Sequence, residues 1–486
     1  MRRVRELGYF SRLFLPEQLN SVGRPAGIIL SGGPRRVSDP DAPDVDFEFL
    51  KSLGCPVLGI CYGMQLLNCK FGGEVSRTGD REYGPAIMRI HDENSLMKNM
   101  PSESRIWMSH TDSVSDLPEG SEVLGNNLKG QPVAIRWNDN FYGIQFHPEV
   151  SHTEHGRTII GNFLSMVKEK PAFLMEKFKD ELLESIARTV SGKRVVCAVS
   201  GGVDSTVLAA LLKEAGADLH PIFVDNGLLR KNEVEDVKGQ FKRLDMEIDC
   251  VDASDAFLKG LKGVTDPETK RQIIGDLFID TFFEKAGKLE LLAQGTLYPD
   301  VIESATSGSI ASRIKTHHNR VDRIIQLQKE GRIIEPLSEL FKDGVRELGQ
   351  TLGLPSDILH RHPFPGPGLA VRVIGEVTRD KLDLLREVDA IFINILKDTG
   401  WYDRIWQAGA VLLPVKSVGV KGDERAYEHP VTLRAVTSTD AMTADWVFLP
   451  HEVLTIISNR ILNEVEGVNR ILYDISTKPP ASIEWE

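Results

Sequence analysis

Two short motifs in the first third of the chain contain the residue types of a thiol-based catalytic triad. Cys61 lies between Gly59 and Gly63, after an apolar run and before a run of helix-forming residues. A nucleophile on a sharp strand-to-helix turn needs small neighbours because the backbone is crowded there, and the helix N-terminus favours the thiolate. In the second motif, His147 can accept the thiol proton and Glu149 can orient the imidazole ring. The order Cys, His, Glu therefore predicts covalent catalysis.

Two alternatives to a triad remain for these residues. Cys61 alone is as well explained by a buried structural cysteine, and His147, His152 and His155 are candidates for a metal site. Pro148 breaks any helical spacing of the histidines, and no further ligand cluster accompanies them in the sequence. The pairing of a glycine-flanked Cys with His-Pro-Glu favours catalysis.

A third motif, Ser-Gly-Gly-Pro at residues 31–34, follows a short apolar run. Paired glycines after a strand let backbone N–H groups turn toward a site, which predicts an oxyanion hole. The alternative is a simple turn.

A fourth motif, Ser-Gly-Gly-Val-Asp-Ser at residues 200–205, is typical of a phosphate-binding loop. It follows an apolar run and opens a helical run, so its glycines would let the backbone approach phosphate oxygens at a helix N-terminus. The Walker pattern is absent, since no Lys follows these glycines. Asp204 suits the Mg²⁺ that accompanies a nucleotide. A glycine-rich structural turn is the alternative.

The elements that must position these motifs fall into three segments. Short apolar runs alternate with helical runs in the first two segments, which predicts α/β folds and, in the second, a parallel sheet. A charged, amphipathic stretch predicts a helical linker at 166–190. The Pro/Gly-rich stretch 362–369 cannot form a regular helix and marks a boundary. We therefore expect domains at 1–165, 191–365 and 366–486, the last mixing helices and strands.

Composition restricts the class of protein. With 486 residues, the chain is long enough for two to four domains of roughly 100–200 residues each. Its 58 Lys+Arg against 70 Asp+Glu give a net charge of −12, which disfavours general binding to nucleic-acid backbones. Five cysteines form a sparse and odd set that argues for a reducing compartment. The apolar runs are far shorter than a bilayer span. We expect a cytoplasmic protein without nucleic-acid or membrane partners.

The motifs together resemble a known enzyme family. Residues 59–65 and 145–149 look like a class I glutamine amidotransferase domain, and residues 200–205 look like the PP-loop of ATP pyrophosphatases. In this order, they resemble the glutamine-hydrolysing GMP synthases over nearly the whole chain. Four further segments carry the same resemblance: 224–230, 293–300, 361–368 and 476–486.

The resemblance implies a fold and a reaction. The fold is α/β: a flavodoxin-like amidotransferase domain, apparently without its first strand, a parallel-sheet ATP pyrophosphatase domain and a smaller α+β dimerisation domain. In the implied reaction, ATP with Mg²⁺ adenylates the C2 oxygen of XMP, and ammonia from glutamine then displaces AMP to give GMP. This is the last step of de novo guanine nucleotide synthesis. The implied assembly is a homodimer.

The resemblance also implies residue roles. In the amidotransferase segment, Cys61 is the nucleophile, His147 its base and Glu149 the orienting group, with backbone N–H groups of Gly33 and Tyr62 as oxyanion donors. The roles implied elsewhere are ATP binding by Ser200, Gly201, Gly202, Val203, Asp204 and Ser205; XMP binding by Arg230, Gln407, Asp423, Lys478 and Glu484; and a lid with Lys315, His317 and His318.

Two departures and two rival functions accompany the resemblance. The family has a strand before the helix that contains Arg-Arg-Val-Arg, whereas this chain begins inside that helix. Either the start codon is misplaced or the domain lacks a strand, and a lost strand would expose a sheet edge and weaken the glutaminase. After His317-His-Asn, the chain continues Arg-Val-Asp-Arg instead of the Val-Gly-Gly that is usual in the family.

Two rival functions remain for the chain. They are a non-catalytic binding protein and another PP-loop ligase of the NAD synthetase or argininosuccinate type.

Overall fold

The structure, a computed structural model, divides the chain into two compact units, residues 1–174 and 175–486. The structure describes all residues except 34, 92–94, 151, 172–173, 298–299, 301–323, 325, 422–423 and 439–442, and at 20, 21, 78–81 and 421 it describes the backbone alone.

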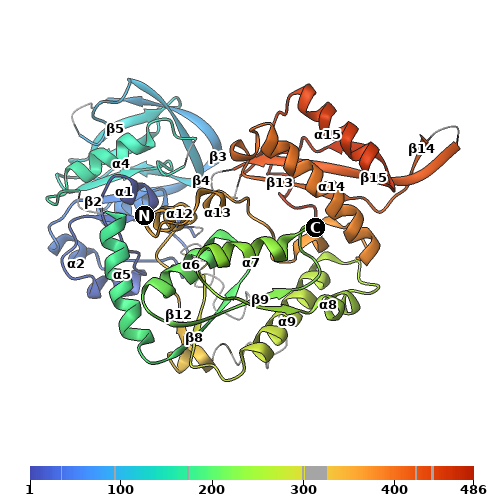
Figure 1. Ribbon diagram of the computed structural model, residues 1–486. Coiled ribbons are helices and arrows are strands. Elements are labelled where there is room, and N and C mark those ends of the chain that lie inside the picture. The colour runs from blue at the N-terminus through green and yellow to red at the C-terminus, as the bar shows by residue number, and fades with distance from the viewer. Residues whose placement is uncertain are drawn as a thin grey trace. The chain divides into compact units, whose positions relative to one another are not determined.

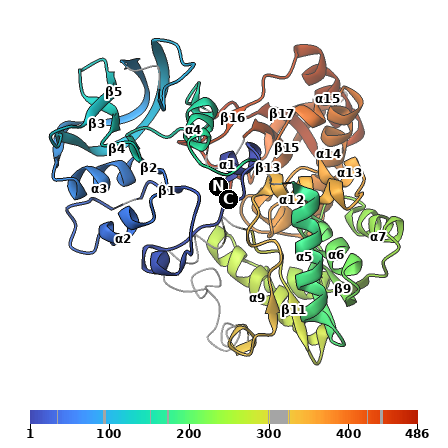
Figure 2. The same cartoon turned by 90° about the vertical axis from the view of Figure 1, so that its left-hand side faces the viewer.

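The first unit contains a seven-stranded mixed sheet in the order β1-β2-β7-β6-β5-β3-β4 (Figures 1 and 2). β1, β2 and β7 are parallel to one another, and the other neighbours are antiparallel. The strands are β1 (Ile28–Leu30), β2 (Val57–Ile60), β3 (Glu74–Ile90), β4 (Glu103–Asp116), β5 (Glu122–Asn127), β6 (Pro132–Arg136) and β7 (Phe141–Ile144). The helices are α1 (Arg2–Glu6), η1 (Pro16–Ser21), α2 (Phe47–Ser52), α3 (Tyr62–Lys70) and α4 (Gly156–Ser165).

Helices cover both faces of the parallel part of this sheet. Val57 of β2 packs in one hydrophobic cluster with Leu50 of α2 and Met64 of α3. Its neighbour Leu58 belongs to a second cluster with Phe163 of α4. Successive strand residues point to opposite faces, so one short apolar strand serves both cores. This α/β arrangement is the one expected for a flavodoxin-like amidotransferase domain.

The second unit contains two sheets. The first is parallel throughout, in the order β10-β9-β8-β11-β12. In the second, β15 pairs with β13, β14 and β16 in antiparallel fashion and with β17 in parallel. The strands are β8 (Arg194–Val199), β9 (Asp218–Asp225), β10 (Asp249–Asp252), β11 (Leu291–Ala293), β12 (Ile333–Ile334), β13 (Gln407–Leu412), β14 (Ser417–Lys421), β15 (Glu424–Thr437), β16 (Asp445–Trp446) and β17 (Val468–Tyr473).

Helices surround these two sheets (Figure 1). They are α5 (Met175–Val190), α6 (Val203–Glu214), α7 (Glu233–Arg243), α8 (Ser254–Gly260), α9 (Pro267–Ala286), α12 (Lys342–Thr351), α13 (Ser356–Leu359), η3 (Gly368–Arg372), α14 (Arg379–Asp398), η4 (Tyr402–Arg404) and α15 (His451–Glu464). No helix in the described part of the chain is long and apolar enough to cross a membrane.

The structure differs from the sequence expectation in the segment between α4 and α5. The helix expected over 166–190 begins at Met175, and residues 166–169 form a turn and a bend. Pro171 accounts for part of the difference, because proline has no N–H to donate within a helix and disfavours helical backbone in the residue before it.

One hydrophobic cluster crosses the boundary expected at 365/366. It contains Phe257 and Ile274 from before this position and Leu369 and Phe392 from after it. A continuous core therefore extends across this position.

Lys270 of α9 is a charged side chain inside this unit. It is fully buried, and its Nζ donates to the carbonyls of Ala370 at 3.2 Å and Val373 at 2.9 Å. The third partner is the Glu486 carboxylate, whose other oxygen accepts from the Gly375 N–H at 3.1 Å. A buried ammonium is tolerated when acceptors surround it in this way. Lys270 thus attaches the last residues of the chain to α9.

We expect Lys270→Met to destabilise the protein by about 3–5 kcal/mol, because it leaves the Glu486 carboxylate buried without its cation. Urea unfolding of the full chain measures the change. Lys285→Met on the same helix is the matched control: its ion pair with Asp249 is half-exposed and should contribute at most about 1 kcal/mol. Adding Glu486→Gln to Lys270→Met should restore part of the lost unfolding free energy. Equal effects of the two lysine substitutions would contradict the assignment.

Candidate active sites

Cys61 occupies a strained turn between β2 and α3. Its backbone has φ 52° and ψ −105°, in a region that non-glycine residues rarely adopt and that costs about 1–3 kcal/mol. A Cβ at Gly59 would lie 2.6 Å from the carbonyl of Gly63, and a Cβ at Gly63 would lie 2.2 Å from the Leu30 oxygen. Only glycine fits at either place, which is the physical reason for the Gly-x-Cys-x-Gly pattern.

His147 and Glu149 lie beside this turn. His147 Nδ1 is 2.7 Å from Glu149 Oε1. A Cβ at Gly32 would be 3.1 Å from His147 Cε1 and 3.6 Å from Cys61 Cβ, so the backbone at Gly32 approaches Cys61 and the imidazole together. The structure therefore brings the three expected triad residues to one place.

The charged form of His147 is strongly favoured. Burial lowers its pKa, but hydrogen bonds to Cys61 and Glu149, together with their charges, outweigh burial and raise the pKa of His147 to about 10. A protonated imidazole beside a thiol stabilises the thiolate, which is the nucleophilic form of cysteine.

A chain of buried amides also holds the sulfur. Gln145 Nε2 lies 3.7 Å from Cys61 Sγ, and Gln65 Nε2 is 3.2 Å from Gln145 Oε1 and 2.6 Å from the Asp112 carbonyl. Neither glutamine is among the site residues expected from the sequence. The available signals were that Gln65 stands one helical turn after Cys61 and that Gln145 begins the His-Pro-Glu motif.

The two expected oxyanion donors lie close to each other. Tyr62 is the first residue of α3, so its N–H belongs to the first turn, whose N–H groups have no carbonyl partner within the helix. A Cβ at Gly33 would be 3.8 Å from Tyr62 Cγ. This proximity supports an oxyanion hole formed by the two residues.

Residues 200–202 form a tight loop between β8 and α6, and residues 203–205 are the first turn of α6. The Ser200 N–H donates to Ser205 Oγ at 3.2 Å, and the Gly202 N–H donates to Ser200 Oγ at 3.3 Å. Gly201 has φ +73°, and a Cβ there would lie 2.5 Å from Val237 Cγ2. Val203 opens α6, so the loop ends at a helix N-terminus, where N–H groups and the dipole favour an anion.

Asp204 has an unusual environment for a carboxylate in the first turn of a helix. Burial raises its pKa, although Lys342 and Arg346 act in the opposite direction. Its Oδ1 is buried and accepts no hydrogen bond in the described structure. A buried carboxylate oxygen with an open position suits a hard cation such as Mg²⁺. The described residues contain no cluster of three or more His, Cys, Asp or Glu that could hold a metal alone, so such an ion would need ligands from the nucleotide.

Three of the five expected XMP residues meet in one buried network. Glu484 binds Arg372 through both oxygens, at 2.8 and 2.9 Å, and accepts from Gln407 Nε2 at 2.8 Å. Arg230 Nε lies 3.1 Å from Asp389. Burial raises the pKa of Glu484, but the charge and hydrogen bonds of Arg372, with the charge of Arg230 and a hydrogen bond from Gln407, lower it overall. No motif in the sequence indicated that Arg372 and Asp389 belong to this network.

Lys478 is the one further expected XMP residue that the structure describes. Lys478 is in the same tail as Glu484, and its backbone pairs with Ala444 at 2.8 and 3.0 Å. The lid residues Lys315, His317 and His318, and Asp423, lie outside the described residues.

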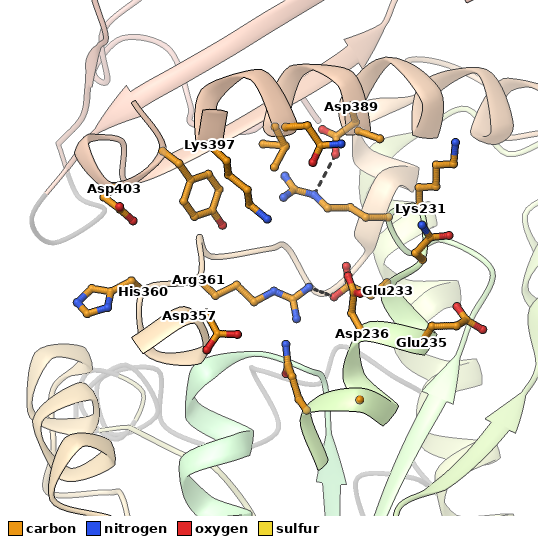
Figure 3. A pocket seen from close by; sticks show the side chains of 18 of the residues that line it. Lys231, Glu233, Glu235, Asp236, Asp357, His360, Arg361, Asp389, Lys397 and Asp403 are labelled. Atoms are coloured by element: carbon orange, nitrogen blue, oxygen red, sulfur yellow. Dashed lines mark hydrogen bonds and ion pairs between the residues drawn. The ribbon is translucent and has the colours of Figure 1, made fainter. Parts of the chain in front are cut away.

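A cleft of about 1190 Å³ opens beside this network (Figure 3). Arg230, Glu233 and Arg361 line it together with charged residues of α7 and α14. Its walls carry both signs of charge, so it is suited to polar ligands.

Three family descriptions match the chain in succession: Glutamine amidotransferase class-I at residues 1–167, tRNA methyl transferase HUP domain at 193–259 and GMP synthase C terminal domain at 394–485. A protein named GMP synthase [glutamine-hydrolyzing] from Thermosipho africanus is 50% identical over 502 residues, with 100% of this chain and 97% of the relative covered. The protein of the same name from Aquifex aeolicus is 51% identical over 496 residues, with 100% and 96% covered. The chain belongs to the glutamine-hydrolysing GMP synthase family.

Membership in this family confirms the resemblance seen in the motifs. The rival assignment to another PP-loop ligase is wrong, because the relatives match the full length of the chain and residues 394–485 match the GMP synthase C-terminal description.

We expect Glu149→Gln to lower the pKa of His147, because the substitution removes a carboxylate that favours the imidazolium. In the unmodified protein the ring should stay protonated up to about pH 10, and in the variant it should lose its proton at a lower pH. NMR titration of the His147 ring measures both.

Glu154→Gln is the matched control for this titration, since Glu154 lies near the same loop but pairs with Arg105. Glu154→Gln should leave the pKa of His147 unchanged. Identical titrations in Glu149→Gln and the unmodified protein would show that Glu149 does not control the imidazole.

Proposed function

We propose that this protein forms GMP from XMP, with ATP as the energy source and glutamine as the nitrogen donor. XMP is adenylated at its C2 oxygen with loss of pyrophosphate, and ammonia then displaces AMP at C2. Glutamate, AMP and pyrophosphate are the other products. The observation that carries the proposal is that full-length members of this family match the chain and that it contains both a Cys-His-Glu constellation and a phosphate loop.

In the first unit, we propose that Cys61 attacks the side-chain amide of glutamine. His147, protonated beside the thiolate, donates its proton to the departing ammonia, and Glu149 holds the ring. The resulting thioester is hydrolysed by water that His147 deprotonates. The N–H groups of Gly33 and Tyr62 stabilise the oxyanion of each tetrahedral intermediate.

In the second unit, we propose that Ser200, Gly201, Gly202, Val203, Asp204 and Ser205 hold the ATP phosphates through the loop and the N-terminus of α6. Asp204 would bind Mg²⁺, which neutralises charge on the pyrophosphate leaving group when it is bound. We assign XMP binding to Arg230, Gln407, Lys478 and Glu484, together with Asp423, and the lid to Lys315, His317 and His318.

The domain roles follow from these assignments. We propose an amidotransferase domain at 1–165, a linker at 166–190, a pyrophosphatase domain at 191–365 and a dimerisation and XMP-binding domain at 366–486.

The five cysteines are free, which supports a reducing, cytoplasmic location.

The decisive experiment compares two nitrogen sources. Cys61→Ala should lower GMP formation from glutamine on the order of 10⁴-fold or more, since the nucleophile is lost. With ammonium salt, AMP and GMP formation should be unchanged, because free ammonia bypasses the thiol. Cys69→Ala on the same helix should leave both activities intact.

Other outcomes of this experiment would contradict parts of the proposal. AMP formation without XMP, or ADP as the product, would contradict the reaction. Glutamine-dependent synthesis retained by Cys61→Ala would refute the triad. If the unmodified protein uses only ammonium, its amidotransferase site is inactive.

We also propose a homodimer formed through residues 366–486. Large apolar side chains are exposed there, including Val418 at 51%, Val420 at 74% and Phe448 at 75%. Val418 and Val420 lie on β14, which with the first residues of β15 projects from the sheet (Figure 1). Exposed apolar groups of this size are typical of an interface between protein chains.

We expect a dimeric mass by light scattering at micromolar concentration. The double substitution Val420→Glu and Phe448→Glu should shift the mass toward the monomer, because charges would be buried at the interface. Leu128→Glu, at an exposed apolar position of the first unit, should not change the mass. A fully active monomer would contradict the proposal.

A further inference from the structure

Residues 361–364 contact both the phosphate loop and the network of proposed XMP residues. At one end, Arg361 Nη1 donates to the Gly201 carbonyl at 2.8 Å. At the other, the Pro363 carbonyl accepts from Gln407 Nε2 at 3.1 Å, and the Phe364 ring lies 5.0 Å from the Arg230 guanidinium. Four consecutive residues therefore connect the two groups.

The Arg361 contact determines which way one peptide of the loop points. In a trans peptide, the carbonyl of Gly201 and the N–H of Gly202 face opposite directions. The carbonyl faces Arg361, and the N–H faces the loop interior, where it donates to Ser200 Oγ at 3.3 Å. If this peptide turned over, a carbonyl oxygen would replace an N–H group on the side that faces the phosphates. Glycine at 201 makes such a rotation sterically accessible.

Glu233 holds the guanidinium in this position. Its side chain is 4% exposed, and its carboxylate pairs with Arg361 Nη2, as the dashed line in Figure 3 shows. Glu233 is the first residue of α7, and its N–H donates to the Arg230 carbonyl at 3.3 Å. A charged pair with one partner this deeply buried has few alternative arrangements, because an unpaired carboxylate there would be costly.

We propose that Arg361 is a positioning residue for ATP activation: with Glu233 it keeps the Gly201 carbonyl away from the nucleotide phosphates and the Gly202 N–H toward them. Residues 363 and 364 tie this orientation to Arg230 and Gln407, so the two proposed substrate sites are aligned by one segment. The inference rests on the proposed function, because it takes residues 200–205 as the ATP loop.

The test measures XMP-dependent AMP formation with ammonium salt as nitrogen source, which leaves the thiol chemistry out. Arg361→Met should lower kcat about 10- to 100-fold and raise the KM for ATP. The kcat and KM of Arg361→Lys should lie between those of Arg361→Met and the unmodified protein. A lysine ammonium can replace one of the two contacts of Arg361, to Gly201 or to Glu233, but not both at once as the planar guanidinium does. A substitution that only unfolds part of the sample would lower the maximal rate and leave the KM for ATP unchanged.

A double variant separates positioning from stability. Arg361→Met leaves Glu233 buried without a partner, so part of its effect could come from destabilisation. Adding Glu233→Gln removes that charge and should restore the unfolding midpoint, but not kcat or the KM for ATP, because the Gly201 carbonyl still lacks its donor. Recovery of the rate in the double variant would overturn the proposal.

Two further variants complete the experiment. Arg379→Met removes an exposed arginine paired with Asp255 and should leave kcat and KM unchanged. Asp204→Asn tests the loop assignment itself and should lower AMP formation on the order of 10²- to 10³-fold. If Asp204→Asn is impaired and Arg361→Met is not, the positioning role is wrong and the proposed function stands. If Asp204→Asn is unimpaired, the ATP loop is assigned wrongly.

Discussion

Both candidate sites depend on a helix whose N-terminus lies directly after the end of a parallel strand. Cys61 connects β2 to α3, and residues 200–202 connect β8 to α6. The first turn of each helix presents N–H groups without helical partners, which makes it a place where negative charge is stabilised. We propose that the same geometry serves a thiolate in one unit and phosphates in the other.

This constraint requires glycine wherever the backbones approach closely. Gly63 fits against the Leu30 carbonyl and Gly201 against Val237 only because neither has a Cβ. The φ of 52° at Cys61 is the accompanying strain, and the buried strand β2 helps to maintain it. The close approach of the backbones and the strained conformation of Cys61 therefore have one cause.

Buried charge organises the second unit. Arg230, Arg372 and Lys270 each lie next to a carboxylate, of Asp389, Glu484 and Glu486 respectively. Since a buried charge cannot exchange its partner for water at low cost, each pair limits the conformations of the segments that carry it. The last residues of the chain are thereby attached to α9 and η3, which places Glu484 beside Gln407.

The sequence by itself determined the local chemistry of both sites. The glycines around Cys61, the His-Pro-Glu motif and the Ser-Gly-Gly-Val-Asp-Ser loop were recognisable because turn geometry and helix N-termini depend on residues next to one another in the chain. The apolar run before residues 200–205 forms the strand β8 for the same local reason. Tertiary structure alone decided which distant side chains complete these sites: Gln145 at the thiol, Arg361 at Gly201, and Arg372 at Glu484. Those partners are far apart in sequence, and a hydrogen bond across such a separation depends on how the strands and helices pack, which residue type and local spacing do not specify.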